Sequence, residues 1–139
     1  MIKESRVLKY PKVIWTILKN APTLDPLVIL LNSKLYYLEN KGNIESFLTI
    51  KEWKDSTEIG TVYTYPEFRN KGLARKLIKS VIKKYKNVGL ICKENLIPFY
   101  KKQGLKKSSS TNNKIEKRKE LFNKTLGKIF KYKLVVMKN

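Results

Sequence analysis

The sequence contains no histidine and only one cysteine, Cys92, and both shortages narrow its chemistry. Without histidine, neither a Ser-His-Asp triad nor a Cys-His pair can form. A single cysteine excludes an intrachain disulfide and a zinc site built on several cysteines. We interpret Cys92 as a small buried hydrophobe rather than an acyl-carrying nucleophile. Proton transfer in any reaction must therefore fall to a carboxylate, tyrosine, lysine, cysteine or water.

Long hydrophobic runs are missing as well. The longest run, Leu27–Leu31, is far too short to span a bilayer. The polar first residues are not followed by the apolar stretch of a signal peptide. We therefore expect a cytoplasmic protein without a membrane partner. Its 139 residues match a single domain over 1–139.

Negative charge and arginine are also scarce. The chain has 31 lysines and arginines against 11 acids, a net charge of +20. Such a field attracts nucleic acid, anionic membranes or phosphate-rich small molecules. Arginine, the usual residue for bidentate phosphate or guanine recognition, occurs only four times. The lysine surplus is therefore more typical of a solvated surface, while a nucleic-acid or ribosome contact through the basic segment 114–128 stays open.

The hydrophobic pattern predicts an α/β fold. The expected strands are 5–10, 35–39, 44–53, 58–65, 88–92 and 129–137. The expected helices are 11–20, 72–85, 95–103 and 115–126. Residues 27–31 fit a helix or a strand equally well, and 106–113 is expected to be a polar loop. A mostly antiparallel meander should thus be followed by one parallel strand–helix–strand crossover in a mixed sheet with flanking helices.

The most informative stretch runs from the strand at 58–65 through a proline-containing turn into the next helix. Small side chains at Gly72 and Ala74 leave room for a close approach to the backbone. The free N–H groups of the helix start then lie beside Arg69, Lys71 and Arg75, which favours binding of phosphates. The pattern is neither a Walker loop nor a Rossmann fingerprint.

Two blocks of this sequence resemble the GNAT superfamily of acyl-CoA-dependent N-acetyltransferases. Arg69, Gly72 and Ala74 fill its (Arg/Gln)-x-x-Gly-x-(Gly/Ala) motif, directly after the Pro-Glu-Phe segment 66–68. A second family block, aromatic-Tyr-x-x-x-Gly-aromatic, is matched by 99–105, with leucine in place of the last aromatic. The resemblance covers roughly residues 44–105 and extends to the order of the expected elements.

The resemblance implies a GNAT-type fold that uses acetyl-CoA as co-substrate and needs no metal. Backbone amides of 70–75 would hold the pyrophosphate, and the strand edge at 62–64 would pair with the pantetheine arm. Asn95 stands five residues before the family tyrosine instead of the usual seven. The implied coenzyme-binding residues are Val62, Tyr63, Thr64, Arg69, Asn70, Lys71, Gly72, Leu73, Ala74, Arg75 and Asn95.

Two residues match the catalytic positions of the family. Tyr100 corresponds to the tyrosine that protonates the departing thiolate, a role that needs no histidine. Glu58 lies eleven residues before Arg69, the spacing of the general base in the histone-acetylating branch. The implied reaction is direct attack of an amine on the thioester, with a strand amide near 62–64 polarising the carbonyl.

The acceptor and the assembly state stay open. A protein N-terminus, a lysine or a small-molecule amine are all compatible with the sequence, as is another acyl group. A polycationic acceptor would need a local acidic pocket, for which the meander offers Glu39, Glu45, Glu52, Asp55 and Glu58. A homodimer through the basic insertion 106–128 is compatible too. The alternative is a non-catalytic nucleic-acid-associated protein of this fold, with Tyr10, Tyr36, Tyr37, Tyr63 and Tyr65 as stacking surfaces.

Overall fold

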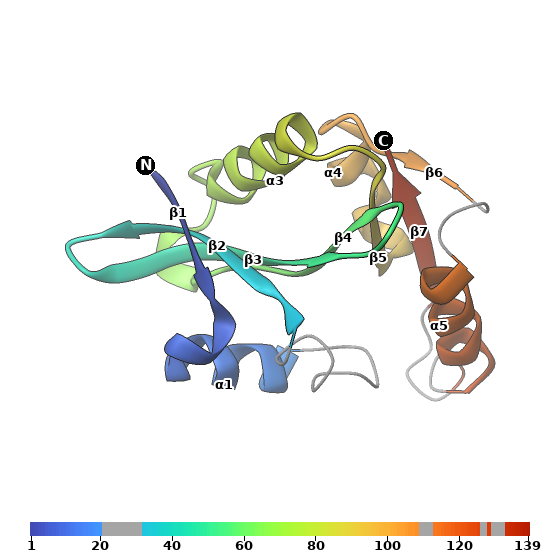
Figure 1. The fold of residues 1–139 in the computed structure, drawn as a ribbon, viewed down its shortest axis with the longest axis horizontal. Helices are drawn as coiled ribbons and strands as arrows, with labels where there is room; N and C mark the ends of the chain where they lie inside the picture. The colour runs from blue at the N-terminus through green and yellow to red at the C-terminus, as the bar shows by residue number, and fades with distance from the viewer. Residues whose placement is uncertain (21–31, 109–112, 126–127, 129–132) are drawn as a thin grey trace.

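A single seven-stranded sheet organises the molecule. The computed structural model describes residues 1–20, 32–108, 113–125, 128 and 133–139. The strand order is β1-β2-β3-β4-β5-β7-β6 (Figure 1). Among the described strands, only β4 and β5 pair in parallel, and all other neighbours are antiparallel. The strands are β1 (Ile2–Arg6), β2 (Lys34–Asn40), β3 (Asn43–Glu52), β4 (Thr57–Thr64), β5 (Val88–Lys93), β6 (Lys106–Lys107) and β7 (Leu134–Lys138).

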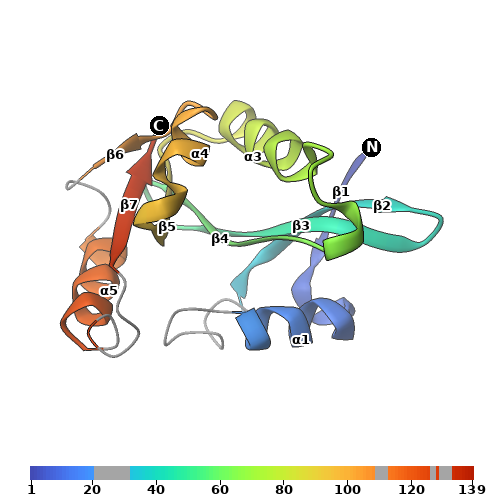
Figure 2. The same ribbon diagram turned by 180° about the vertical axis from the view of Figure 1, so that it is seen from behind.

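Helices cover both faces of this sheet. In the described ranges, the helices of eight or more residues are α1 (Pro11–Asn20), α3 (Leu73–Lys84) and α5 (Asn113–Lys124), and α4 (Ile97–Lys101) is a short one. Helices α3 and α4 lie on one face, α1 lies on the other, and α5 lies beside β7 (Figures 1 and 2). Three 3₁₀ turns occupy Val7–Lys9, Pro66–Phe68 and Glu94–Leu96. No helix in the described ranges has the length and apolar character needed to cross a membrane.

Two hydrophobic clusters hold the layers together. The larger cluster joins Leu77, Ile78 and Val81 of α3 to side chains of β2, β3, β4, β5 and β7. The smaller cluster joins Val13 and Ile17 of α1 to the opposite face of the sheet. In β3, Phe47 belongs to the smaller cluster and Leu48 and Ile50 to the larger one, and all three are buried. This explains why the central strands are apolar on both faces, as expected for a sheet covered twice.

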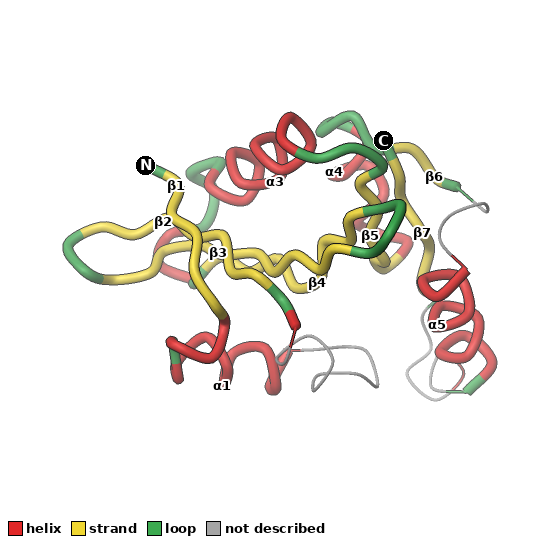
Figure 3. The backbone as a smooth tube through the Cα atoms, in the orientation of Figure 1, coloured by secondary structure: helices red, strands yellow, loops and turns green. Residues whose placement is uncertain are grey.

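A bulge in β4 determines where the sheet opens. The register of β3 and β4 shifts between Leu48 and Ile50, opposite Gly60. A Cβ at Gly60 would lie 2.5 Å from the Thr49 hydroxyl. Any larger residue would therefore displace this hydroxyl, which accepts a hydrogen bond from the Thr61 N–H at 2.9 Å. The parallel ladder between β4 and β5 ends one residue earlier, at the pair Ile59–Leu90. Because a bulge bends its strand, the outer half of β4 diverges from β5 and its edge is left unpaired (Figure 3).

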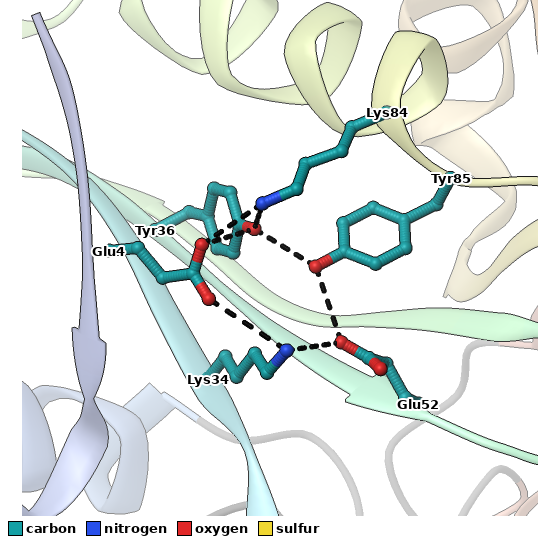
Figure 4. A network of polar contacts seen from close by, with 6 residues as sticks. All are labelled: Glu4, Lys34, Tyr36, Glu52, Lys84 and Tyr85. Carbon is teal, nitrogen blue, oxygen red and sulfur yellow. Dashed lines mark hydrogen bonds and ion pairs between the residues drawn. The ribbon is translucent and has the colours of Figure 1, made fainter.

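A polar network fixes the C-terminal end of α3 over the meander. The Tyr36 hydroxyl donates to Glu4 at 2.7 Å, accepts from Lys84 at 2.6 Å, and lies 2.9 Å from the Tyr85 hydroxyl (Figure 4). Tyr85 in turn donates to Glu52 at 3.2 Å. The network continues to Lys34, whose ammonium lies 2.6 Å from the Glu52 carboxylate. It therefore connects β1, β2 and β3 to the end of the helix whose other end begins the candidate site.

Most predicted elements are present, and three predictions need correction. The first strand is β1 rather than 5–10, because residues 7–9 form a 3₁₀ turn before Pro11. The expected polar loop 106–113 begins with the short strand β6, which pairs with β7 through backbone groups and so needs no apolar side chains. The last strand, expected over 129–137, spans Leu134–Lys138 and does not include Lys133, while residues 129–132 lie outside the described residues. The run 27–31 and parts of the segment 114–128 lie outside the described residues.

Candidate active site

A groove of about 720 Å³ lies where β4 separates from β5. Three chain segments form it: the outer half of β4, the turn into α3 with the first turn of that helix, and the 3₁₀–α4 segment. Its volume falls in the range of small-molecule sites. The lining residues are Val62, Tyr63, Thr64, Phe68, Arg69, Asn70, Gly72, Leu73, Ala74, Arg75, Leu96 and Phe99.

Backbone N–H groups are concentrated at one end of this groove. Gly72 is the N-cap of α3, with φ at 74°, and no side chain caps the helix there. The first intrahelical acceptor bond runs from Lys76 N–H to the Gly72 carbonyl at 3.0 Å. Within the described chain, the N–H groups of residues 73–75 have no backbone acceptor. These three donors and the positive end of the helix dipole form an anion site.

The left-handed conformations in this turn explain its glycine. Asn70 has φ at 63°, one residue after the extended Arg69 and two before Gly72. A Cβ built on Gly72 meets no protein atom within 4 Å. The glycine therefore serves the backbone conformation and leaves the space beside the amides open. A phosphate-bearing ligand fits such a cradle, because its oxygens can approach the three N–H groups directly.

Arg69 is already oriented before any ligand binds. Its Nε–H donates to the Thr64 carbonyl at 3.1 Å, and its guanidinium lies 5.8 Å from the centre of the Tyr63 ring. The side chain is exposed, so its remaining N–H groups can donate to an anion in the groove. Lys71, by contrast, lies over the Phe68 ring at 5.3 Å and does not line the groove.

Glu58 lies next to the point where the two central strands part. It pairs in register with Gly89, one residue before the last β4–β5 pair, and its side chain is 6% exposed. Trp53 Nε1–H donates to Glu58 Oε2 at 2.9 Å. Lys51 lies directly across the strand pair from Glu58, and its ammonium lies 4.4 Å from the Trp53 ring centre. The carboxylate is thus held by neighbours from β3 and the turn that follows it.

Tyr100 is buried on the other side of the opening. It belongs to the larger hydrophobic cluster together with Cys92 of β5, and its ring contacts Phe99 edge-on at 5.0 Å. Burial raises the pKa of the Tyr100 phenol well above its ordinary value, and Cys92 adds to this rise. Burial likewise raises the pKa of the Cys92 thiol to about 11. Both groups therefore remain protonated at neutral pH.

The two candidate catalytic groups approach the opening from opposite faces. Ile59 belongs to the larger cluster under α3, so its neighbour Glu58 points to the α1 face. Tyr100 packs in that same larger cluster, on the α3 face. A reacting group placed between the separated strands would thus have a carboxylate on one side and a phenol on the other. The geometry can remove a proton on one face and supply one on the other.

The structure gathers most of the predicted coenzyme residues around one groove. Nine of them line it, while Lys71 and Asn95 are exposed and do not. Sequence reasoning missed three apolar lining residues, Phe68, Leu96 and Phe99. Phe68 and Phe99 lie inside the two motif blocks, so their proximity to the motifs was the available signal. The bulge was missed too, although an isolated glycine within a strand, Gly60, is its usual sign.

Comparison with known proteins agrees with this geometry. A family model described as "Acetyltransferase (GNAT) family" matches residues 8–105. No curated protein matches the sequence. A GNAT family acetyltransferase from Elizabethkingia anophelis, solved with acetyl-CoA bound, superposes with a TM-score of 0.69 at 17% identity, covering 99% of this chain and 95% of that one.

Two further solved structures have the same fold. An acetyltransferase from Bacillus subtilis in complex with CoA gives a TM-score of 0.68 at 13% identity, over 99% of this chain and 95% of that one. An IAA acetyltransferase from Bacillus cereus gives 0.65 at 16% identity, over 78% of each chain. These likenesses concern the fold. Together with the family match over most of the sequence, they show that the chain belongs to the GNAT acetyltransferase family.

Proposed function

We propose that the protein is an N-acetyltransferase that moves an acetyl group from acetyl-CoA to the amine of a protein or small-molecule acceptor. The observation that carries this proposal is the opening between β4 and β5 directly beside the uncapped start of α3. It combines an anion site, an unpaired strand edge and two proton-transfer groups in one place. Family membership supports the same class of reaction.

The anion site would hold the pyrophosphate of the coenzyme. The N–H groups of residues 73–75 would donate to its oxygens, and Arg69 and Arg75 would add charge-assisted hydrogen bonds. The unpaired edge of β4 at 62–64 would hydrogen-bond the pantetheine amides like an added strand. Leu96 and Phe99 would cover the apolar part of that arm. Acetyl-CoA, when bound, supplies an acetyl group activated as a thioester.

Glu58 and Tyr100 would then move the protons of the transfer. Glu58 would take a proton from the acceptor, either from its ammonium before attack or from the amine as it attacks, directly or through water. Tyr100 would donate its phenolic proton to the sulfur as the carbon–sulfur bond breaks and the carbon–nitrogen bond forms. A backbone N–H of β4 near Val62 would stabilise the charge on the carbonyl oxygen. No metal is needed in this scheme.

Fewer acids are available to bind an acceptor than the sequence suggests. Of the five acids in the meander, Glu39 is paired with Lys3, and Glu52 with Lys34. Glu58 is the one that lies at the strand opening. Two of the five acids are thus already compensated by lysines, which favours an acceptor with a single amine over a polycationic one. The homodimer, the cytoplasmic location and the use of a different acyl group stay predictions, and the non-catalytic alternative gains no support from the family match.

The direct test combines binding with turnover. Purified protein is screened by thermal shift against a panel of acyl-CoAs, and the stabilising thioester is then incubated with candidate amines and peptides. Mass spectrometry should show an acceptor heavier by one acyl group and a matching release of free CoA thiol. Stabilisation by no acyl-CoA would contradict the proposal, because the groove would then not be a coenzyme site.

A further inference from the structure

The positive charge of the molecule is concentrated in one part of the chain. Residues 68–107, which run from the turn before α3 to β6, contain thirteen lysines and arginines and one acid, Glu94. Residues 32–65, which form the β2–β4 meander, contain four lysines and five acids. A general preference for lysine at the surface would raise both counts alike. The contrast indicates that the excess positive charge of the α3–α4 layer has a role specific to that layer.

The outer side of α3 is a continuous basic stripe. Arg75, Lys76, Lys79 and Lys83 are exposed, and the helix buries its apolar residues on the other side. In the described part of the chain, the ion pairs involve Lys3, Lys34 and Lys84, so these four side chains are uncompensated. From Arg75 to Lys83 the helix rises about 12 Å, which equals the axial rise of three to four base pairs of a nucleic-acid duplex.

The stripe belongs to a larger basic face. Lys101 and Lys102 at the end of α4 and Lys106 and Lys107 in β6 are exposed. Helices α3 and α4 lie on the same face of the sheet (Figures 1 and 2). Strand β6 is the edge strand of the sheet and lies beside α4 (Figures 1 and 2). We call this surface the α3–α4 basic face; it comprises Lys76, Lys79, Lys83, Lys101, Lys102, Lys106 and Lys107.

The residue types on this face favour some classes of polyanion over others as ligands. Lysine without arginine suits contact with phosphates rather than reading of base edges. Single-stranded nucleic acid is usually held by stacking on exposed aromatic rings. Here Tyr100 is buried, Phe99 lines the groove, and Tyr85 is engaged with Glu52. Three of the five tyrosines considered for stacking, Tyr36, Tyr37 and Tyr65, are buried as well.

An anionic membrane fits this face less well. Membrane-surface elements combine basic residues with apolar side chains that enter the lipid. Two large apolar side chains on α1 are exposed enough to enter lipid: Trp15 at 69% and Leu18 at 45%. Helix α1 lies on the opposite face of the sheet (Figure 1). Leu96, which is 39% exposed in the turn before α4, lines the groove instead. The basic lysines therefore have no separate apolar anchor beside them in the described residues, whereas a rigid duplex needs only phosphate contacts.

We propose that the α3–α4 basic face binds the phosphate backbone of double-stranded nucleic acid without reading its sequence. On α3 the face begins beyond Arg75, the last residue of that helix that lines the groove, and none of its seven lysines lines the groove, so the two sites adjoin without coinciding. This binding is independent of acetyl transfer and coexists with it. It would place the enzyme next to amines of proteins that are themselves bound to nucleic acid.

The experiment measures fluorescence anisotropy of a labelled 20-base-pair DNA duplex at several salt concentrations. The test variant is Lys79→Glu with Lys83→Glu, and the matched control is Lys41→Glu with Lys54→Glu in exposed turns of the meander. Both change the net charge equally. We expect the test variant to weaken binding at least about tenfold and to lower the salt slope by about two, one unit per lost phosphate contact. The control should change affinity less than twofold.

Three results would overturn the proposal. Equal weakening by both double variants would show that net charge, rather than this face, determines binding. Tighter binding of a single strand of the same length would assign the site to unpaired nucleic acid. Binding to phosphatidylserine vesicles without duplex binding would assign the face to a membrane. Acetyl-CoA affinity, measured on the same samples, separates these failures from a failure of the proposed enzymatic function and checks that the variants are folded.

Discussion

Trp53 holds the Glu58 carboxylate at the strand opening. Its Nε1–H donates to Oε2 at 2.9 Å, and a hydrogen bond to a charged group contributes about 1.5–3 kcal/mol. Trp53 does not line the coenzyme groove. A change at this residue should therefore alter proton removal from the acceptor without altering coenzyme binding.

Replacing Trp53 by phenylalanine tests this position. Trp53→Phe keeps an aromatic ring but removes the donor, and we expect kcat to fall about tenfold with an unchanged KM for acetyl-CoA. In a double-mutant cycle, the loss should disappear in a Glu58→Gln background, because the hydrogen bond then has no carboxylate to orient. Additive losses in the cycle would contradict the link between the two residues.

In the proposed mechanism, Tyr100 supplies the other proton. Its hydroxyl makes no hydrogen bond within the described chain, so Tyr100→Phe removes an oxygen without breaking a native contact. We expect kcat to fall about 10²- to 10⁴-fold, the usual contribution of a general acid, while thermal stability changes little. Steady-state kinetics and a melting curve of the same preparation measure both. A variant with full activity would remove Tyr100 from the mechanism.

At the scale of elements, the network around Tyr36 connects α3 to the meander. Burial of the phenol, with the nearby Glu4 carboxylate, raises the pKa of Tyr36 to about 12. A raised pKa in the folded state means that the fold favours the protonated phenol. The resulting stabilisation is complete below the ordinary tyrosine pKa of about 10 and is lost as the pH rises from there to about 12.

The expected result is a steep loss of stability in alkali. Urea unfolding at pH 9, 10 and 11 should give a midpoint that falls with pH in the wild type and falls less in Tyr36→Phe. Tyr36→Phe should also be less stable than the wild type at pH 9, because Glu4 and Lys84 lose their shared hydroxyl. Identical alkaline slopes for the two proteins would contradict the assignment.

Sequence reasoning located the elements whose conformation is determined by neighbouring residues. It failed for those whose conformation is determined by residues far away in the chain. The turn between β2 and β3 was predictable because Gly42 supports a φ of 80°, and the α3 stripe because its buried residues follow a helical period. The strand β6 was not predictable, since its two lysines pair only through β7, about thirty residues later. The Tyr36–Tyr85 contact joins residues 49 positions apart and leaves no local sign.

The candidate site shows the same division. The anion site at the start of α3 followed from one short motif, because backbone amides, glycine and arginine are neighbours in the chain. The position of Glu58 relative to Tyr100 depends on how three strands are aligned in the sheet, which no local motif shows. The bulge at Gly60, which opens β4 from β5, depends on the Thr49 side chain of the adjacent strand. Family resemblance identified Glu58 and Tyr100 as the candidate catalytic pair. It did not reveal the bulge.

For the whole molecule, the net charge of +20 has an effect on stability. Like charges repel one another more in the compact state than in the extended one, and salt screens this repulsion. We expect the melting temperature to rise by several degrees between 0.05 M and 0.5 M NaCl, with KCl giving the same rise. A lower melting temperature at high salt would show that specific ion pairs outweigh the net repulsion.

Calorimetric titration of acetyl-CoA into three proteins tests the coenzyme site most directly. Gly72 and Gly42 both have positive φ and no atom within 4 Å of a built Cβ, so a glutamate strains the backbone at either position. Only Gly72→Glu places a carboxylate beside the N–H groups of residues 73–75, where like-charge repulsion of a phosphate costs several kcal/mol. We predict binding by the wild type and by Gly42→Glu, and an affinity at least about 100-fold weaker for Gly72→Glu. Equal affinity of all three proteins, or no binding by the wild type, would contradict the assignment of this groove to the coenzyme.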